Sequence, residues 1–318
     1  MEIVIIGHQQ IISQLRHAVS EDHIAGAYLF VGAPNVGKET VALYFVKSIN
    51  CLDLVHRPCD NCLACHKINT GNHPDFQVVR PEGKQIKIDQ IRQLQRQVVF
   101  QPIEGRRKLY IITEANRMNL EAANCLLKTL EEPPARSVLI LLTSNLDALL
   151  PTIRSRCQII SFQPLPVPEL VEILTDRFSL DADHASSIAV LSQGAVGKAL
   201  TLIEDKSLTV IDQIPEVVTT TDRLSAFRIA EQLGEDLTQL DQLVMWYRDL
   251  LLIRQSTSVD LLTHRNHLES LQQIAKNYSR IHLQSAIKAI FETKRLIERN
   301  VNATLALEVL VFKLMRTE

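Results

Sequence analysis

The feature that most constrains the fold is a glycine-rich loop between an apolar run and a helical run. The run Tyr28–Val31 is followed by Gly32–Lys38, which has the pattern G-x-x-x-x-G-K, and then by Val41–Phe45. Strand, loop and helix in this order predict a P-loop, whose backbone N–H groups and helix N-terminus surround phosphate oxygens. The candidate nucleotide-binding residues of the loop are Gly32, Gly37 and Lys38.

Short runs rich in Val, Ile and Leu alternate with stretches of helical spacing through the first half of the chain. Strand alternating with helix is typical of a parallel sheet covered on both faces, so we expect an α/β domain. The expected strands are Val4–Ile6, Ala27–Val31, Gln77–Val79, Lys108–Thr113, Val138–Thr143 and Gln158–Phe162.

A proline-rich stretch, Gln163–Pro168, ends this alternation, and no convincing strand follows it. We therefore expect a P-loop core over residues 1–164, with an inserted cysteine-rich module at about 51–65. A small helical lid is expected over 165–207 and an all-helical C-terminal domain over 208–318, where Leu240–Ile253 has amphipathic spacing.

The predicted P-loop lacks its usual magnesium ligand. The residue after Lys38 should be Ser or Thr, but it is Glu39, and Thr40 carries the hydroxyl one position late. The helix dipole favours a carboxylate in the first turn by about 0.3–1 kcal/mol. Repulsion from a phosphate charge at ~4 Å, with a dielectric constant of about 20, is about 4 kcal/mol and outweighs that gain unless a cation intervenes.

The second half of the metal site is also altered. The strand Leu109–Ile112 leads into Thr113 and Glu114, where an Asp-Glu pair is expected to hold magnesium and polarise water. Thr40 and Glu114 remain candidate residues of a degenerate nucleotide site. Our hypothesis is that the chain hydrolyses no ATP by itself, while ATP binding is left open.

Charge and hydropathy exclude some functional classes. The net charge is −2 and the pI about 6.6, so there is no global attraction to nucleic acid or to anionic membranes. This argues against a free-standing zinc-dependent nucleic-acid-binding module. No stretch approaches the ~20 apolar residues of a membrane span, and no signal sequence is recognisable, so we expect a cytoplasmic protein without a membrane partner.

Four cysteines, Cys51, Cys59, Cys62 and Cys65, fall within fifteen residues. Four thiolates at such spacing suit a tetrahedral structural zinc ion (Zn²⁺) with no open coordination position. An iron–sulfur cluster is the alternative, but the bacterial spacing requires a cysteine where Asn69 stands.

The fourth metal ligand is the least certain one. Cys51 is separated from the other three cysteines, and His56 or His66 could replace it. Cys125 and Cys157 stand alone in apolar contexts, which is typical of unliganded core cysteines.

Four segments spread over nearly the whole chain carry a family resemblance. They are Ala115–Pro134, Leu150–Cys157, Trp246–Leu251 and Asn302–Glu308. They resemble the bacterial clamp loaders of DNA polymerase III, which are AAA+ proteins, and the second segment contains that family's Ser-Arg-Cys motif. The resemblance implies an AAA+ core, a helical lid and a helical collar domain for oligomerisation.

Within this family the sequence is most similar to the delta-prime subunits. Two departures from the motor subunits are the missing magnesium ligands, and a third is Gly197, where the motors carry a sensor arginine, with Lys198 beside it. The resemblance implies a non-hydrolysing part of the DNA polymerase III holoenzyme. Arg156 of the Ser-Arg-Cys motif would be an arginine finger, reaching the γ-phosphate held by a neighbouring subunit.

The resemblance also implies partners: motor subunits gamma or tau, a delta subunit, and through the complex a sliding clamp and primed DNA. The alternative is an active motor of the gamma or tau kind, which needs Glu39 or Thr40 to seat magnesium.

Weaker signals complete the pattern. Gly7–Gln9 resembles the family's adenine-side turn, and Thr143–Asn145 stands at the sensor-1 position. Family analogy suggests that some basic residues contact DNA phosphates, and the alternative is that they only form a solvated helix face. These residues are Arg92, Arg96, Arg106, Arg107 and Lys108.

Overall fold

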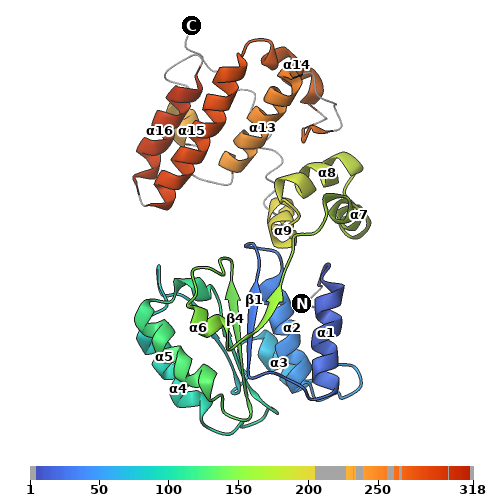
Figure 1. Cartoon of the computed structure of the whole chain (residues 1–318). Coiled ribbons are helices and arrows are strands. Elements are labelled where there is room, and N and C mark those ends of the chain that lie inside the picture. The colour runs from blue at the N-terminus through green and yellow to red at the C-terminus, as the bar shows by residue number, and fades with distance from the viewer. Residues whose placement is uncertain are drawn as a thin grey trace. The chain divides into compact units, whose positions relative to one another are not determined.

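The computed structural model describes residues 5–204, 227–231, 233, 239–255, 261–264, 267–299 and 301–315. It divides into two compact units (Figure 1). The first comprises Met1–Leu165 with Ala195–Gly197, and the second comprises Pro166–Gly194 with Lys198–Glu318.

The first unit is built on a five-stranded parallel sheet with the order β2-β3-β4-β1-β5. Tyr28 pairs with Ile140 on one side and with Gln158 on the other, so β1 lies inside the sheet. The expected α/β fold with a parallel sheet is thereby confirmed. The strands are β1 (Ala27–Val31), β2 (Phe76–Val79), β3 (Lys108–Ile112), β4 (Ser137–Thr143) and β5 (Gln158–Ser161).

Helices cover both faces of this sheet. In Figure 1, α1, α2 and α3 lie on one face and α4 and α5 on the other. Strand side chains alternate accordingly: Tyr28 and Phe30 belong to the first core, and Leu29 to the second. The helices are α1 (Gln9–Ser20), α2 (Lys38–Asn50), α3 (Leu63–Asn69), α4 (Ile88–Val98), the 3₁₀ turn η1 (Ala115–Arg117), α5 (Leu120–Glu131) and α6 (Pro151–Arg154).

The predicted strand Val4–Ile6 was wrong where the structure describes it. Ile5 and Ile6 belong to no strand, and Val4 lies outside the described residues. Gly7 and His8 both have positive φ, 74° and 58°, and α1 begins directly after them. The chain therefore turns before it can pair with the sheet, and Ile5 only packs against the first core.

The described residues of the second unit form helices joined by turns, with no strand among them. Its helices are α7 (Val167–Phe178), α8 (Ala182–Leu191), α9 (Val196–Glu204), which starts in the first unit, α13 (Gln239–Arg254), α14 (Leu268–Ala275), α15 (Arg280–Glu298) and α16 (Ala303–Leu314). α13 packs against α14 and α15, and α15 against α16, around fully buried Leu250, Leu283 and Leu307. None of the helices described is long and apolar enough to cross a membrane.

Candidate functional site

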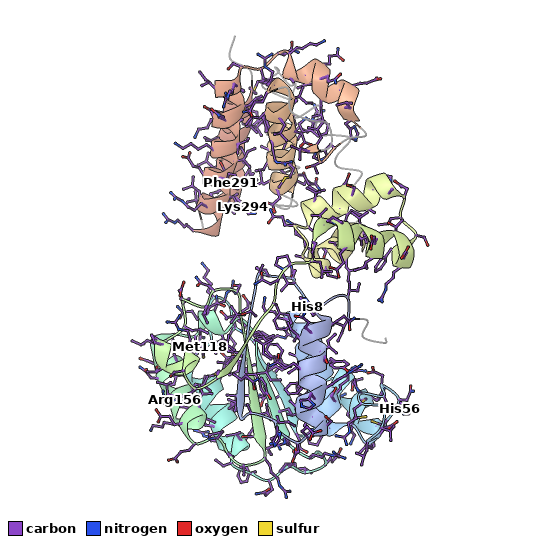
Figure 2. The ribbon with its side chains drawn as sticks, turned by 45° about the vertical axis from the view of Figure 1, so that its right-hand side comes forward. His8, His56, Met118, Arg156, Phe291 and Lys294 are labelled. Atoms are coloured by element: carbon purple, nitrogen blue, oxygen red, sulfur yellow. The ribbon has the colours of Figure 1, made fainter. Side chains whose placement is uncertain are left out.

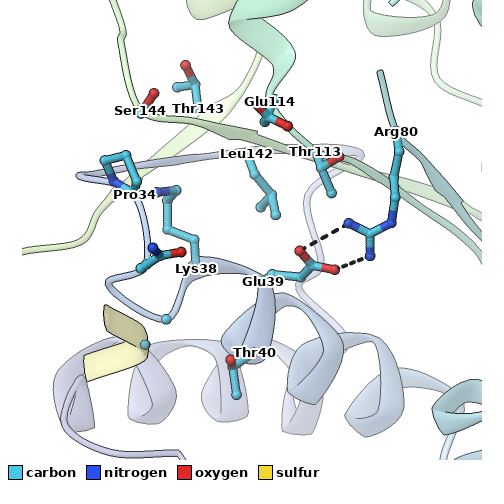
Figure 3. A pocket seen from close by; sticks show the side chains of 13 residues that line it. Pro34, Lys38, Glu39, Thr40, Arg80, Thr113, Glu114, Leu142, Thr143 and Ser144 are labelled. Atoms are coloured by element: carbon cyan, nitrogen blue, oxygen red, sulfur yellow. Dashed lines mark hydrogen bonds and ion pairs between the residues drawn. The ribbon is translucent and has the colours of Figure 1, made fainter. Parts of the chain in front are cut away.

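A pocket of about 440 Å³ lies at the edge of the sheet where β1 to β4 end (Figure 3). Parallel strands bring their carboxyl ends to one edge, which is where α/β proteins bind ligands. The P-loop and the start of α2 form one wall. The pocket is lined by Pro34, Asn35, Gly37, Lys38, Glu39, Thr40, Arg80, Thr113, Glu114, Leu142, Thr143, Ser144 and Gly197.

Lys38 is folded onto its own loop. Its ammonium donates hydrogen bonds to the carbonyl oxygens of Gly32, at 2.7 Å, and Ala33, at 2.6 Å. Burial lowers the pKa of Lys38 to about 8. Gly32 permits the close packing of this loop, because a Cβ there would lie 2.5 Å from the backbone oxygen of Phe162.

Glu39, at the magnesium-ligand position, forms an ion pair with Arg80 (Figure 3). Nη1 of Arg80 lies 3.4 Å from Oε2 of Glu39, and Nη2 contacts Oε1, so the pairing is bidentate. Sequence reasoning missed Arg80. The signal was available, since a charged residue directly after a buried parallel strand stands at the ligand edge of the sheet.

The residues after β3 are also engaged within the chain. The hydroxyl of Thr113 donates to the carbonyl oxygen of Val79 at 3.3 Å. Glu114 adopts a left-handed conformation (φ 47°), and its Oε2 lies 3.0 Å from Nε of Arg117. The pocket therefore offers no Asp-Glu pair for a magnesium ion at this position.

Gly197, where the family resemblance implied a sensor arginine in the motors, packs against the P-loop. Its N–H donates to the carbonyl oxygen of Asn35 at 2.8 Å, and a Cβ on Gly197 would lie 2.8 Å from the same oxygen. Any larger side chain there requires a backbone shift. The neighbouring Lys198 donates to Asp241 at 3.1 Å.

The two weaker sequence signals also lie near the loop. Nε2 of His8, in the Gly7–Gln9 turn, lies 2.7 Å from the carbonyl oxygen of Val36. The hydroxyl of Thr143 donates to Oδ1 of Asn116 at 3.1 Å.

Arg156, labelled in Figure 2, stands at the amino ends of the parallel strands, opposite the end that carries the P-loop. It precedes β5, whose first residue, Gln158, pairs with Tyr28 near the start of β1, whereas the P-loop follows the end of β1. Its Nη2 lies 2.8 Å from Oε1 of Glu131, and its Nη1 donates to the carbonyl oxygen of Thr152 at 3.0 Å. The side chain is 35% exposed, so it is accessible from outside the chain.

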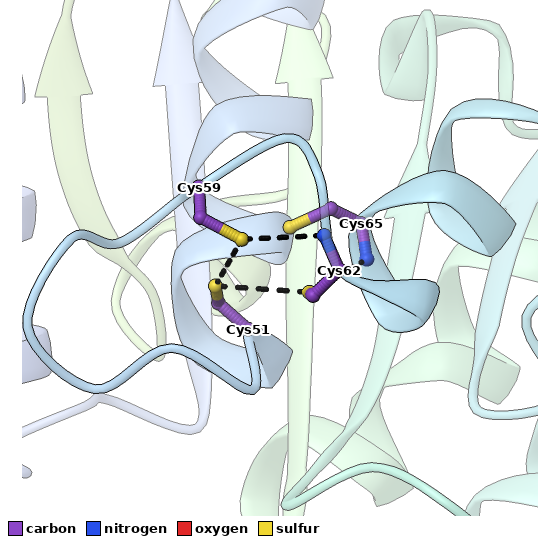
Figure 4. Close-up of side chains that lie close together, drawn as sticks. All are labelled: Cys51, Cys59, Cys62 and Cys65. Atoms are coloured by element: carbon purple, nitrogen blue, oxygen red, sulfur yellow. Dashed lines mark hydrogen bonds between the residues drawn. The ribbon is translucent and has the colours of Figure 1, made fainter.

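The structure brings the thiols of Cys51, Cys59, Cys62 and Cys65 together (Figure 4). All four Sγ atoms lie within 4.8 Å of one another, and that of Cys51 lies 3.5 Å from Cys59 and 3.9 Å from Cys62. A tetrahedron with Zn–S bonds of about 2.3 Å places its sulfur atoms about 3.8 Å apart. The cluster therefore has the dimensions and donor set of a metal site with four cysteine ligands.

The histidines that were alternatives to Cys51 lie outside this group. Nδ1 of His56 is 3.6 Å from a carboxylate oxygen of Asp53, and its side chain is 82% exposed. The segment is attached to α2 by Lys47, which is fully buried and forms an ion pair with Asp60.

The two isolated cysteines have other surroundings. Cys125 Sγ donates to Oε1 of Gln95 at 3.0 Å. Burial raises the pKa of Cys157 to about 12, so this thiol stays protonated at neutral pH.

Several of the basic residues considered for DNA are engaged by other groups of the chain. Arg92 lies 3.4 Å from Asp89, and Arg107 lies 2.9 Å from Asp22. Lys108 is buried and donates to the carbonyl oxygen of Gln97 at 3.1 Å.

Comparisons with known proteins identify the family. The family described as DNA polymerase III, delta subunit, matches residues 7–166, and its C-terminal counterpart matches residues 206–315. DNA polymerase III subunit delta' of Bacillus subtilis is 34% identical over 319 residues, covering 96% of this chain and 95% of that protein. This chain belongs to the delta-prime family of DNA polymerase III clamp-loader subunits.

More distant relatives are gamma and tau subunits of DNA polymerase III. Subunit tau of Bacillus subtilis is 25% identical, and the match covers 98% of this chain but 61% of tau. Among solved structures, a gamma subunit-related protein of Thermotoga maritima is similar with a TM-score of 0.43 and 17% identity, covering 95% of this chain and 98% of that one. The family resemblance read from the sequence is confirmed by the delta-prime match.

Proposed function

We propose that this delta-prime family member hydrolyses no ATP itself and completes the nucleotide site of a neighbouring clamp-loader subunit with Arg156. The observation that carries the proposal is the position of Arg156 at the sheet edge opposite its own P-loop. The length of strand β1 separates the two, and this separation supports a role of the guanidinium on a nucleotide bound by another chain.

An arginine suits this role because its guanidinium stays charged and donates in a fork that matches phosphate oxygens. In the chain alone, Glu131 takes the place of the phosphate as the anionic partner. That ion pair is partly exposed, and such pairs contribute about 0–1 kcal/mol. Exchanging Glu131 for a γ-phosphate therefore costs little.

The altered metal position supports the absence of hydrolysis. Glu39 is paired with Arg80, and Thr113 with the backbone of β2, where a motor would present magnesium ligands. The degenerate pocket of Gly32, Gly37, Lys38, Thr40 and Glu114 retains the P-loop shape, and ATP binding there is a separate question from hydrolysis.

We also propose that the four-cysteine cluster holds a structural zinc ion. Cys51, Cys59, Cys62 and Cys65 would bind it, and a closed set of four thiolates leaves no position for a substrate. The ion would then fix the loop between α2 and α3.

The proposed partners are motor subunits of the gamma or tau kind and a delta subunit. The complex would load the sliding clamp on primed DNA during replication. In this arrangement residues 1–164 form the AAA+ core, 165–207 the lid and 208–318 the collar domain through which subunits assemble.

The test is the ATPase activity of this chain alone and then mixed with motor and delta subunits. Arginine fingers contribute about 10³–10⁵ in rate in some NTPases. We therefore expect Arg156→Ala to reduce turnover at the site it completes by at least about tenfold, with assembly unchanged. Arg154→Ala is the matched control, because Arg154 stands two residues away with similar exposure. Unchanged turnover with Arg156→Ala would reject the finger.

The alternative, an active motor of the gamma or tau kind, predicts a different result. Magnesium-dependent turnover by the purified chain, abolished by Lys38→Ala, would exclude the non-hydrolysing role. It would leave the test of Arg156 unaffected.

A further inference from the structure

A second groove, of about 520 Å³, lies on the first unit between α1 and the segment Cys51–Cys65. We call it the α1 groove. Its walls are Arg16, Val19 and Ser20 of α1, Ser48 of α2, and residues 54–58 of the cysteine segment. It is separate from the P-loop pocket, with which it shares no lining residue.

Two arginines give the α1 groove a positive charge. Nε of Arg57 is inaccessible to solvent and has no hydrogen-bond partner among the described residues. Arg16 is held by Tyr44, to whose hydroxyl its Nε donates and whose ring lies 5.6 Å from its Cζ. No carboxylate of the described residues lies within 4 Å of either guanidinium. Arg16 is exposed and Arg57 half-buried, so both guanidiniums are open to an anionic ligand from outside the chain.

The outer wall of the α1 groove is apolar. Val55 is 81% exposed and Leu54 57% exposed. Leu52 of the same loop and Leu63, the first residue of α3, are each 62% exposed but do not line the groove. Neighbouring exposed aliphatic side chains such as Leu54 and Val55 are typical of interaction sites.

The loop that carries these side chains is fixed in place. Oδ1 of Asp53 accepts from the N–H groups of Val55, at 2.8 Å, and His56, at 3.0 Å. The carboxylate of Asp53 also contacts His56, which Figure 2 shows at the surface. It therefore neutralises neither Arg16 nor Arg57. A fixed loop loses little conformational entropy on binding.

We infer that the α1 groove binds a segment of a partner protein in which an acidic residue adjoins a large apolar one. The carboxylate would receive charge-assisted hydrogen bonds from Arg16 and Arg57, and the apolar side chain would cover Leu54 and Val55. A phosphate ion would leave both aliphatic side chains exposed. Single-stranded nucleic acid uses aromatic platforms for stacking, whereas the exposed apolar side chains of this groove, Leu54 and Val55, are aliphatic.

The test is selection of a random displayed peptide library on the full-length chain. The Arg16→Gln/Arg57→Gln double variant serves for counter-selection. We expect the chain to enrich peptides in which Asp or Glu adjoins Leu, Ile or Phe. A library that yields no enriched peptide, or the same peptides on both proteins, would overturn the inference.

One enriched peptide, labelled with fluorescein, then gives affinities by fluorescence anisotropy. We expect Arg16→Gln and Val55→Ser each to weaken binding roughly tenfold, the effect of losing about 1.4 kcal/mol. Arg92→Gln, on α4, is the control and should change nothing. Circular dichroism and metal content must match the wild type, since Arg57 adjoins the cysteine cluster. If a single-stranded oligonucleotide binds more tightly than the peptide and Arg16→Gln weakens that binding, the ligand is nucleic acid and the inference is wrong.

These outcomes are independent of the proposed finger. The peptide assay uses the isolated chain, whereas Arg156 is tested by turnover in the assembled complex.

Discussion

At the scale of single residues, Arg80 neutralises the carboxylate of Glu39 in the P-loop pocket. The sequence places a carboxylate, Glu39, where phosphates would repel it by about 4 kcal/mol per charge pair at ~4 Å. Arg80 is the cation that faces this carboxylate. Both side chains are about half exposed, so the pair adds little to folding stability, and its effect is to neutralise charge in the pocket.

Restoring the metal ligands should therefore restore a metal-dependent site. In the variant Glu39→Thr/Thr113→Asp, a hydroxyl and a carboxylate return to the positions that hold magnesium in P-loop proteins. We expect magnesium to strengthen binding of a fluorescent ATP analogue at least about tenfold in this variant and not in the wild type, titrated with magnesium or with EDTA. Thr70→Ser, outside the pocket, is the control. Magnesium-independent binding in the double variant would show that other residues block the site.

Asp75 organises the turn that leads into β3. Its carboxylate accepts hydrogen bonds from the N–H groups of Ile103, Glu104 and Gly105, at 2.8 to 3.0 Å. Burial alone would raise the pKa of Asp75, but these hydrogen bonds outweigh it and lower the pKa below the ordinary value.

Asp75→Asn should destabilise the first unit by about 1–3 kcal/mol at pH 7, because charge-assisted hydrogen bonds are lost. A carboxyl with a lowered folded pKa stabilises the protein above its unfolded pKa, about 3.9, and this contribution is lost as the pH falls through the folded value. Urea denaturation should show the difference from wild type shrinking below about pH 4. Asp89→Asn, exposed on α4, is the control; a constant difference would contradict the charge-based account.

At the scale of elements, the segment between α2 and α3 depends on the cysteine cluster. It has no regular structure from Leu52 to Cys62, yet it exposes several large aliphatic side chains. Cys62 begins α3 by accepting a hydrogen bond from the N–H of Cys65 at 3.4 Å. The proposed metal ion, bound by four thiolates, would supply the cross-link that a loop of this composition lacks.

Cys59→Ser should abolish metal binding, because it removes one thiolate of four. We expect about one zinc ion per wild-type chain by elemental analysis. We expect a Tm lower by about 5 °C in the variant, since 1 kcal/mol corresponds to about 2–4 °C in a domain of this size. Cys125→Ser should keep the metal and serves as control. Iron in place of zinc would favour the iron–sulfur alternative.

At the scale of the whole molecule, each unit has its own core. In the second unit, the fully buried carboxylate of Asp249 joins α13 to the following loop. It accepts from the N–H groups of Thr263, at 3.0 Å, and His264, at 2.9 Å, and lies 2.9 Å from Nδ1 of His264. This network and the cysteine cluster stabilise different units.

We therefore expect two thermal transitions in calorimetry. A zinc chelator should lower only the transition of the first unit, and Asp249→Ala only that of the second. The variant leaves buried donors without a partner, which costs about 3 kcal/mol or more. Asp176→Ala, exposed on α7, should leave both transitions in place. One transition that both treatments lower would show that the units unfold together.

The sequence by itself determined the parallel sheet and the P-loop. It also placed the cysteines close together along the chain and supplied the motifs that mark the family. These features depend on neighbours along the chain, namely hydrophobic period, glycine positions and ligand spacing. The expected strand at Val4–Ile6 was wrong for Ile5 and Ile6, because a local apolar run does not decide whether a segment pairs with a sheet; that depends on the whole fold.

Tertiary structure alone decided which charges meet. Glu39 and Arg80 are 41 residues apart in the sequence. The α1 groove is lined by helix α1 and by a loop about forty residues further along the chain. It also set Glu131 of α5 against Arg156, because the packing of α5 beside the start of β5 is a property of the whole fold.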